Sequence, residues 1–403
     1  MIQDILKGCE SFNQDYINLI AAECIAYPQV KEILGCNLMD RRIEGLPEHR
    51  WYPGDAVADQ VEEYAIAKVT DLFSYNYANV QPYSGSLANL AVYVALLEPG
   101  DAVLSLGMKS GGHVSHGARA HYTHHLYNFH EYGLNEKEEI DFDQVRELTL
   151  KFKPRLITVG ASSYYQVFNW AMFREIADLV GAIVLADISH LTGLIVAGRQ
   201  ASPKGHAHIV TFDTHKMLRG PRGGVLLWDD EAFSRKLNLA VSPRLQGAAF
   251  SNVIAAKALA FEKAVLPEFS NYINNILSNT RKLADCLLAK GYRLVSGSTM
   301  NHMLSIDVGC HGYTGLALSQ KFEQHRILIQ RNQLPSDSRS VVETSGVKVG
   351  LSYLTCLGVN VANVVRIADI INAGIQAKWE QVDELRDLVL SSLSGESGNM
   401  FPE

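Results

Sequence analysis

The chain has 403 residues, of which 47% are hydrophobic and 20% are charged. This composition is typical of a soluble globular protein and argues against extended disorder or a fibrous repeat. The length predicts two or three domains. With 36 basic and 43 acidic residues the net charge is -7, and no run of lysine and arginine stands out, so we expect no nucleic-acid partner.

No apolar stretch is long enough to span a membrane, and the first residues lack the basic start and apolar core of a signal peptide. The 6 cysteines form no CxxC pair, which indicates free thiols in a reducing compartment. We therefore expect a cytoplasmic protein without a membrane partner.

The first part of the chain is predicted to be helical. The spacing of apolar residues predicts a helix over residues 56–73, with Asp55 as its N-cap. A second helix is predicted over residues 87–97, between the small residues 84–86 and the turn sequence 98–101.

Short apolar runs then predict strands, and a helical segment over 170–180 separates two of them. The runs are 102–106, 155–160, 182–187, 208–212 and 224–228. Strands that alternate with helices indicate an α/β domain with a mostly parallel sheet, buried on both faces. In such sheets, ligand-binding residues collect beyond the carboxyl ends of the strands.

The pattern changes again after residue 250. A long helical stretch to 288, two apolar runs at 292–297 and 302–308, and helix over 361–393 predict a smaller α+β domain. The expected division is an N-terminal arm over 1–45, a large α/β domain over 46–265, a small domain over 266–393 and a flexible tail over 394–403.

Three features fall where such a sheet would place a site. The residues 84–86 open a helix, and their amides and hydroxyls suit a phosphate, although an ordinary serine cap would look the same. Asp187 closes a buried strand, where a carboxylate needs a cationic partner such as the protonated ring nitrogen of pyridoxal phosphate, or serves as a helix cap.

Lys216 is the third feature and follows the run 208–212 closely. Between hydroxyl and imidazole groups it suits a Schiff-base lysine, whereas the alternative is a surface lysine in a loop. Together the three features specify a phosphate cradle, a ring-nitrogen partner and an aldehyde-binding lysine, in the chain order of the large aminotransferase-type fold.

A cluster of histidines offers another kind of chemistry. It comprises His113, His116, His121, His124, His125 and His130. His121, His124 and His125 have helical spacing, but no cysteine or carboxylate pattern completes a ligand set. We expect no metal site, and expect one histidine to stack on a cofactor ring.

Several blocks in order resemble the serine hydroxymethyltransferase family over nearly the whole chain. They are LIAAEC (19–24), EGLPEHRWYPG (44–54), YANVQPYSGSLAN (77–89), SGGHVSHG (110–117), ADISHLTGLI (186–195) and DTHKMLRGPRGG (213–224). The resemblance implies a fold type I pyridoxal-phosphate enzyme with a mostly parallel, seven-stranded large domain and a smaller α+β C-terminal domain. It also implies a homodimer with shared active sites, or a tetramer of two such dimers.

The resemblance implies a role for each matching residue. Lys216 would hold pyridoxal phosphate, Asp187 would pair with its ring nitrogen, and His113 would stack on the ring. The phosphate would be bound by Ser84, Gly85 and Ser86, with Gly247 of a neighbouring subunit, while Ser162, His190 and His215 would hydrogen-bond around the cofactor. Glu44 would be the acid/base group, with Tyr52 nearby, and His215 would act beside Lys216.

The substrate side departs from the family pattern. The family's carboxylate-binding arginine is Lys348 here, and lysine cannot reproduce the two-pronged contact. Losing one charge-assisted hydrogen bond costs about 1.5–3 kcal/mol. Arg42 replaces a tyrosine, Ala22 replaces a serine, and Asp213 stands in a threonine-rich run. We hypothesise a re-specified pocket in which Arg42, paired with Asp213, takes over part of the anion binding.

The folate side is also altered. The candidate folate-binding residues are Glu44, Met108, Gly112, Val114 and Asn332. Asn332 resembles a pterin contact of the family, whereas Met108 and Val114 replace leucines and Trp51 replaces a tyrosine. Ser242 stands where the family has a phenylalanine that packs near the folate.

The sequence predicts an enzyme that cleaves and forms the Cα–Cβ bond of a small β-hydroxy amino acid. The leading hypothesis is reversible hydroxymethyl transfer between serine and glycine with tetrahydrofolate, which Asn332 and Glu44 favour. The alternative, which Ser242 favours, is a folate-independent L-threonine aldolase or transaldolase, or an α-substituted serine hydroxymethyltransferase. Such an enzyme would add a glycine- or alanine-derived carbanion to another aldehyde. A non-catalytic paralogue would be expected to lack Lys216 or Asp187, and both are present.

Overall fold

The computed structural model describes residues 2–335 and 337–395. Backbone contacts divide the chain into two compact units, one of residues 24–270 and one of residues 1–23 with 271–403. We call these the large unit and the small unit. The predicted domain boundaries at residues 45 and 265 stay a prediction, and residues 396–403 of the expected tail lie outside the described residues.

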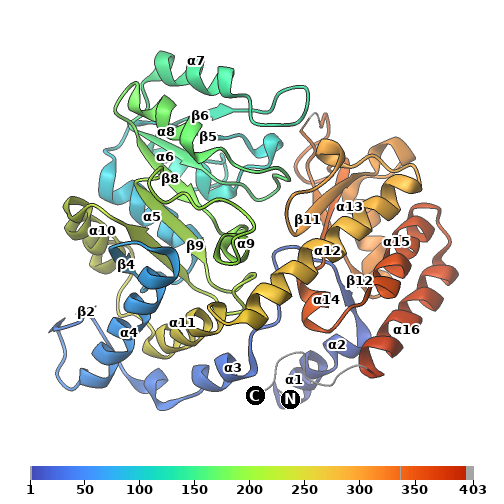
Figure 1. Cartoon of the computed structure of the whole chain (residues 1–403), viewed down its shortest axis with the longest axis horizontal. Helices are drawn as coiled ribbons and strands as arrows, with labels where there is room; N and C mark the ends of the chain where they lie inside the picture. The colour runs from blue at the N-terminus through green and yellow to red at the C-terminus, as the bar shows by residue number, and fades with distance from the viewer. Residues whose placement is uncertain (1, 336, 396–403) are drawn as a thin grey trace. The chain divides into compact units, whose positions relative to one another are not determined.

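The large unit contains a seven-stranded sheet in the order β4-β10-β9-β8-β7-β5-β6 (Figure 1). The strands are β4 (Tyr77–Asn79), β5 (Ala102–Leu106), β6 (Asn128–Tyr132), β7 (Leu156–Val159), β8 (Ile183–Asp187), β9 (Ile209–Asp213) and β10 (Gly224–Trp228). Strands β5 to β9 run parallel, and β10 is antiparallel to both of its neighbours. The predicted α/β class with a mostly parallel sheet is confirmed, and each of the five predicted apolar runs contains or overlaps a strand.

Helices cover this sheet because their apolar sides match its buried strands. They are α3 (Pro28–Leu34), α4 (Ala56–Phe73), α5 (Gly85–Leu96), α6 (Thr123–Leu126), α7 (Phe142–Phe152), α8 (Trp170–Asp178), α9 (Thr192–Val196), α10 (Ser234–Leu239) and α11 (Ser251–Ala264). Helix α5 packs Ala88, Val92 and Tyr93 into a cluster with strand residues such as Leu185 and Leu226. The buried interior therefore holds the N-terminus of α5 against the ends of β9 and β10.

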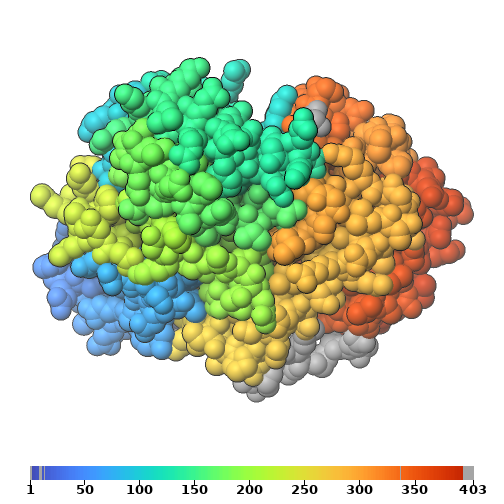
Figure 2. Space-filling view, turned by 45° about the horizontal axis from the view of Figure 1, so that its top comes forward, coloured from blue at the N-terminus to red at the C-terminus, as the bar shows by residue number. Residues whose placement is uncertain are grey.

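A short hairpin of β2 (Gly45–Leu46) and β3 (His49–Arg50) precedes α4. Ile43, two residues before this hairpin, forms a β-bridge with Ala249. Figure 2 shows this blue part of the chain beside the yellow-green segment around residues 230–250, at one end of the large unit.

Both helical stretches are present as predicted, and each has one local feature that the prediction lacks. Helix α4 begins at Ala56 as predicted, but Asp55 makes no capping bond, because its carboxylate accepts a hydrogen bond from Arg41 Nη2 at 3.1 Å instead. The predicted long helix after residue 250 is interrupted between α11 and α12 (Pro267–Ala289), since proline cannot continue a helix but fits its first turn.

The small unit contains a three-stranded antiparallel sheet in the order β11-β14-β13, with β11 (Met303–Asp307), β13 (Gln330–Asn332) and β14 (Gly346–Gly350). Strands β1 (Ile17–Asn18) and β12 (Ile327–Leu328) pair in parallel. The helices are α1 (Ile2–Glu10), α2 (Phe12–Asp15), α12, α13 (Gly315–Gln324), α14 (Ser352–Cys356), α15 (Val361–Ile375) and α16 (Trp379–Gly395).

The small unit also differs from the prediction in two places. The apolar run 292–297 ends in a 3-10 turn, Val295–Gly297, and not in a strand, because Ser296 and Gly297 both have positive φ. The predicted helix 361–393 is divided into α15 and α16, with Ala377 in the left-handed region at φ 58. No helix in the described part of the chain combines the length and apolarity that crossing a membrane requires.

Candidate active site

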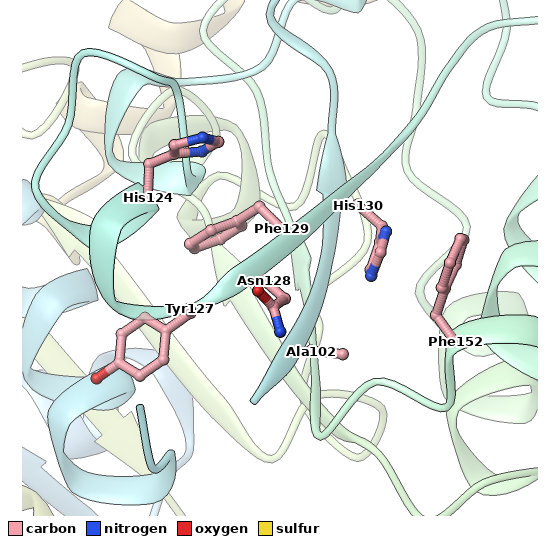
Figure 3. Close-up of a pocket in the computed structure, with 7 residues that line it drawn as sticks. All are labelled: Ala102, His124, Tyr127, Asn128, Phe129, His130 and Phe152. Atoms are coloured by element: carbon pink, nitrogen blue, oxygen red, sulfur yellow. The ribbon is translucent and has the colours of Figure 1, made fainter. Parts of the chain in front are cut away.

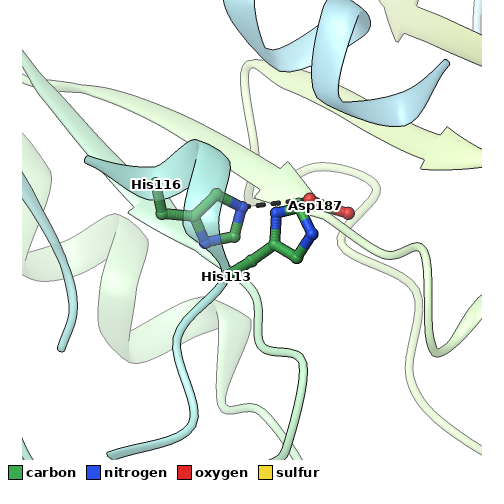
Figure 4. Close-up of side chains that lie close together, drawn as sticks. All are labelled: His113, His116 and Asp187. Atoms are coloured by element: carbon green, nitrogen blue, oxygen red, sulfur yellow. Dashed lines mark hydrogen bonds and ion pairs between the residues drawn. The ribbon is translucent and has the colours of Figure 1, made fainter. Parts of the chain in front are cut away.

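Asp187 closes β8, and its buried carboxylate has several polar partners. Oδ2 lies 2.7 Å from Asn89 Nδ2 and 3.0 Å from His116 Nε2, and Oδ1 accepts from the backbone N–H of Ser189 at 3.0 Å. Burial opposes the charged form, but the hydrogen bond and charge of His116 outweigh it and hold the pKa of Asp187 well below its usual range. Figure 4 shows the His113 ring beside this carboxylate. Asp187 is therefore an anion at neutral pH, as a protonated ring nitrogen requires.

Asn89 joins this carboxylate to a wider polar network in the core. Its Nδ2 also lies 2.9 Å from Ser115 Oγ, and its Oδ1 accepts from Thr211 Oγ1 at 2.5 Å. Ser115 Oγ is in turn 2.7 Å from His113 Nδ1. The predicted site residues include none of Asn89, Ser115 and Thr211. The available signal was an amide inside the apolar run 87–97, because a buried amide needs hydrogen-bond partners.

Lys216 follows β9 by three residues and is 7% exposed. Its Nζ lies 3.1 Å from Asp213 Oδ2. Burial lowers the pKa of the adjacent His215 to about 4, and His215 Nδ1 is buried without a hydrogen-bond partner among the described residues. A neutral imidazole with an unused ring nitrogen therefore lies next to the lysine.

Residues 84–86, which were predicted to bind a phosphate and are called the cradle here, form the N-terminus of α5. Ser84 caps the helix, and its Oγ accepts from the N–H of Leu87 at 3.2 Å. The N–H of Gly85 donates to Asp213 Oδ1 at 2.8 Å. Because the amides of a helix start point at the same place and the helix dipole favours an anion there, the geometry suits a phosphate.

Lys257 in α11 supports the segment that leads into this cradle. Its side chain is fully buried, and its Nζ donates to the carbonyl oxygens of Val80, Pro82 and Gly224 at 2.6, 3.1 and 2.9 Å. Burial lowers the pKa of Lys257 to about 7. The three carbonyl oxygens use all three donors of an ammonium group. Through these hydrogen bonds Lys257 holds the segment 80–82 against β10.

The hairpin region carries Glu44, Arg42 and Tyr52. Arg42 Nε and Nη2 donate to Glu44 Oε1 at 3.1 and 2.5 Å, and the guanidinium lies 5.4 Å from the centre of the Tyr52 ring. The side chain of Glu44 is 12% exposed, whereas that of Arg42 is 66% exposed. The hypothesised pair of Arg42 with Asp213 is not found in this chain, where the carboxylate partner of Arg42 is Glu44.

A buried polar network anchors the hairpin to α4. Arg50 forms ion pairs with Asp59 and with Glu62, each at 2.7 Å, and the Arg50 and Glu62 side chains are 4% and 1% exposed. Arg50 Nη1 and Gln81 Nε2 both donate to the carbonyl of Gly45, at 2.5 and 3.0 Å. Gln81 Nε2 also donates to Glu62 at 2.8 Å. The hairpin and the segment before the cradle thus share one set of buried partners.

The loop after β5 holds His113 in place. Burial and the neighbouring His116 lower the pKa of His113 to about 4. The N–H of Ser162 donates to the carbonyl of Gly111 at 2.8 Å. Gly111 has φ +98, and a Cβ added at Gly112 would lie 2.1 Å from a carbonyl oxygen of β5. Both positions therefore require glycine, one for its backbone conformation and one for the close approach.

The remaining predicted residues of the large unit lie as follows. His190 is buried in the turn after β8, and Met108 is half-buried in the loop after β5. Val114 is 43% exposed in the same loop. Gly247 is exposed on the segment that follows α10.

The other predicted residues belong to the small unit. Lys348 is buried in β14, where its Cα pairs with those of Ser305 and Gln330. Asn332 lies in β13, and its Nδ2 donates to the next carbonyl oxygen at 2.8 Å. Ala22 follows β1. The substrate- and folate-binding roles of these residues stay predictions.

The histidine-rich segment 113–130 does not converge on one point. One ligand atom from each of His113, His116 and Asp187 lies within 4.8 Å of the others, and this is the one group in the described ranges that could hold a metal ion. The carboxylate of this group, Asp187, is the one that the resemblance assigns to a cofactor ring. His116 was predicted only as a member of the histidine cluster, and its contact with Asp187 was missed.

Two other histidines, His124 and His130, line a separate hollow of about 460 Å³ over β6 (Figure 3). The His130 ring stacks on Phe152 with centroids 3.6 Å apart. Lys216 and Asp187 are absent from the residues that line this hollow. The expectation of no metal site stays a prediction.

The residues of the large unit fit pyridoxal phosphate. Asp187 would supply a buried anion for a protonated ring nitrogen, and Lys216 would supply an amine for the aldehyde. The cradle supplies amides and hydroxyls for the phosphate, and the unused Nδ1 of His215 offers one more polar contact. This set follows the ends of two neighbouring parallel strands, where a doubly wound sheet binds its ligands.

Comparison with known proteins identifies the family. The family model described as serine hydroxymethyltransferase matches residues 1–371. A serine hydroxymethyltransferase of Dichelobacter nodosus is 42% identical over 88% of this chain and 86% of its own length. One of Lactobacillus johnsonii is 40% identical over 96% of both chains, and one of Xanthomonas campestris pv. campestris is 41% identical over 89% and 88%. The chain therefore belongs to the serine hydroxymethyltransferase family, whose members are fold type I enzymes that use pyridoxal phosphate and tetrahydrofolate.

Proposed function

We propose that the protein transfers the hydroxymethyl group of serine reversibly to tetrahydrofolate and leaves glycine. The observation that carries this proposal is that Asp213 at the end of β9 contacts both Lys216 and Gly85 of the cradle, while the ionised Asp187 ends the neighbouring parallel strand β8. The chain is also about 40% identical to named serine hydroxymethyltransferases over most of its length.

Each residue has a distinct task in this proposal. When bound, pyridoxal phosphate accepts the electrons of the Cα–Cβ bond that breaks. Asp187 keeps the proton on the ring nitrogen, because its carboxylate is ionised and held in place by Asn89 and His116. Lys216 would hold the cofactor through its aldehyde, because its amine is buried close behind β9.

Glu44 moves the proton of the substrate hydroxyl. Arg42 donates to its Oε1, so we assign proton exchange to Oε2. The neutral His215 presents an unused ring nitrogen beside Lys216 and orients polar groups there without adding charge.

A proton-exchange experiment tests the function. The cofactor-loaded enzyme is mixed with glycine in deuterated water, with and without tetrahydrofolate, and loss of the glycine α-proton is followed by NMR alongside the long-wavelength absorbance. We expect both signals to grow with folate, since a folate site that couples to Cα chemistry defines hydroxymethyl transfer. If proton loss and absorbance do not change when folate is added, and threonine releases an aldehyde, the enzyme is instead an aldolase or transaldolase.

We also propose that Arg42 takes over part of the substrate-carboxylate binding from the family's arginine, whose position Lys348 occupies in this chain. Replacing Arg42 by tyrosine, the family's residue type, then removes a charged donor and raises the KM for glycine and serine by about ten- to a hundredfold. Adding Lys348→Arg restores a low KM. The exposed ion-pair residue Arg174, changed to Gln, serves as the control. An unchanged KM in the Arg42→Tyr enzyme contradicts this assignment.

The proposal includes a cytoplasmic homodimer with shared active sites. Large exposed apolar side chains after the hairpin support it, because Trp51, Tyr52 and Val57, in the hairpin's continuation and the first turn of α4, are 65, 42 and 63% exposed. Five cysteines are free thiols in the structure, which is consistent with a reducing compartment.

A further inference from the structure

A carboxylate of the chain itself lies at the phosphate cradle. Asp213 Oδ1 accepts the N–H of Gly85 at 2.8 Å, and Asp213 Oδ2 lies 3.1 Å from Lys216 Nζ. The fit is close, since a Cβ added at Gly85 would lie 2.6 Å from that Oδ1. The backbone N–H of Asp213 donates to Ser189 Oγ at 3.1 Å, which fixes the aspartate at the end of β9.

The position of this carboxylate is the one that an anionic ligand would favour. The start of an α-helix presents free amides and a partial positive charge. Of the first three amides of α5, those of Gly85 and Leu87 are bound by Asp213 and by Ser84. An anion of the chain itself therefore satisfies a donor that the predicted cradle reserves for phosphate.

We infer that Asp213 is an internal substitute for the phosphate of pyridoxal phosphate in the cofactor-free enzyme, and that the two anions compete for the amide of Gly85. Lys216, the other partner of Asp213, is also the residue that binds the cofactor's aldehyde. Loading the cofactor thus withdraws both partners from the carboxylate. The charge of Asp213 stabilises the empty site and weakens the binding of the cofactor.

This inference predicts that one variant has a lower melting temperature without the cofactor but a higher affinity for the cofactor. Asp213→Asn removes the charge and with it the ion pair to Lys216, and Asp213→Thr also removes the carboxylate contact with the helix terminus, so in both variants the cofactor-free enzyme melts at a lower temperature. The same change removes a like charge a few ångströms from a phosphate, so pyridoxal phosphate binds about five- to tenfold more tightly. A residue that only maintained the fold would weaken both properties.

The experiment uses the full-length chain after removal of the cofactor. Dissociation constants for pyridoxal phosphate and for inorganic phosphate are measured by absorbance and by calorimetry, and thermal midpoints are recorded without ligand. Asp229→Asn is the matched control, because Asp229 also follows a strand and pairs with a lysine, Lys204, at 2.5 Å. We expect the control to bind both ligands as the unchanged enzyme does.

Inorganic phosphate separates competition at the cradle from effects on the lysine, since phosphate carries no aldehyde. Tighter binding of both ligands by Asp213→Asn, with a lower melting temperature of the empty enzyme, supports the inference. If Asp213→Asn binds phosphate as tightly as the unchanged enzyme does, or more weakly, the inference is overturned. Asp213 would then either help to bind the phosphate or serve only to maintain the fold. A higher melting temperature of the empty variant also overturns it. No amino acid or folate is present, so the result does not depend on the proposed reaction.

Discussion

Replacing Asp187 by asparagine is expected to lower the rate of glycine proton exchange by about 10²–10³-fold, the usual effect of removing one preorganised electrostatic contact. Asparagine has the size of aspartate but no charge, so it cannot hold a proton on a ring nitrogen. Burial and the fixed partners Asn89 and His116 are retained. The rate is measured by NMR on enzyme saturated with cofactor.

Two observations separate this effect from a loss of structure. The variant should keep its thermal midpoint to within a few degrees and should still bind the cofactor. Asp178→Asn is the control, because Asp178 is 56% exposed and pairs only at the surface with Arg174. An Asp187→Asn enzyme that exchanges glycine protons at the normal rate would remove Asp187 from the mechanism.

The buried ion pair of Glu62 with Arg50 is expected to have the largest effect on stability. Glu62→Ala should lower the free energy of unfolding by about 3–5 kcal/mol, since it leaves a buried guanidinium with only one carboxylate. Burial opposes the charge of Arg50, but Glu62 and Asp59 outweigh burial and raise the pKa of Arg50. Urea denaturation of the full chain measures the loss.

The adjacent residue supplies the control for this prediction. Glu63 lies on the exposed side of α4, and Glu63→Ala should change stability by less than about 0.5 kcal/mol. Glu62→Gln keeps an oxygen for Gln81 and Arg50, so its cost should fall between those of the two alanine variants. If Glu62→Ala proved as mild as Glu63→Ala, the network around Gly45 would not anchor the hairpin.

The central strands and their polar ends could be predicted from the sequence. Runs such as 182–187 and 208–212 are apolar because both faces of those strands are buried, and a lone carboxylate or lysine after them is conspicuous. Strand β6 could not be found in this way. It lies at the edge of the sheet, and its sequence Asn128–Tyr132 mixes polar and apolar residues because most of them are partly exposed.

The partners of the site residues were harder to predict than the residues themselves. Lys216 and Asp187 have recognisable positions, whereas Asn89 and Ser115 are ordinary polar residues whose role depends on a contact across 26 residues of chain. Arg42 illustrates the same limit. Its charge suggested an anionic partner, but its nearest carboxylate is Glu44, two residues away.

The buried Lys257 has a consequence for how the family motif GPRGG can vary. A Cβ added at Gly223 would lie 2.3 Å from Lys257 Cε, and Gly223 has no positive φ that would itself demand glycine. The glycine is therefore required by the lysine stem and not by the turn. The two positions are expected to co-vary, so that a homologue with a shorter residue in place of Lys257 is free to carry a side chain in place of Gly223.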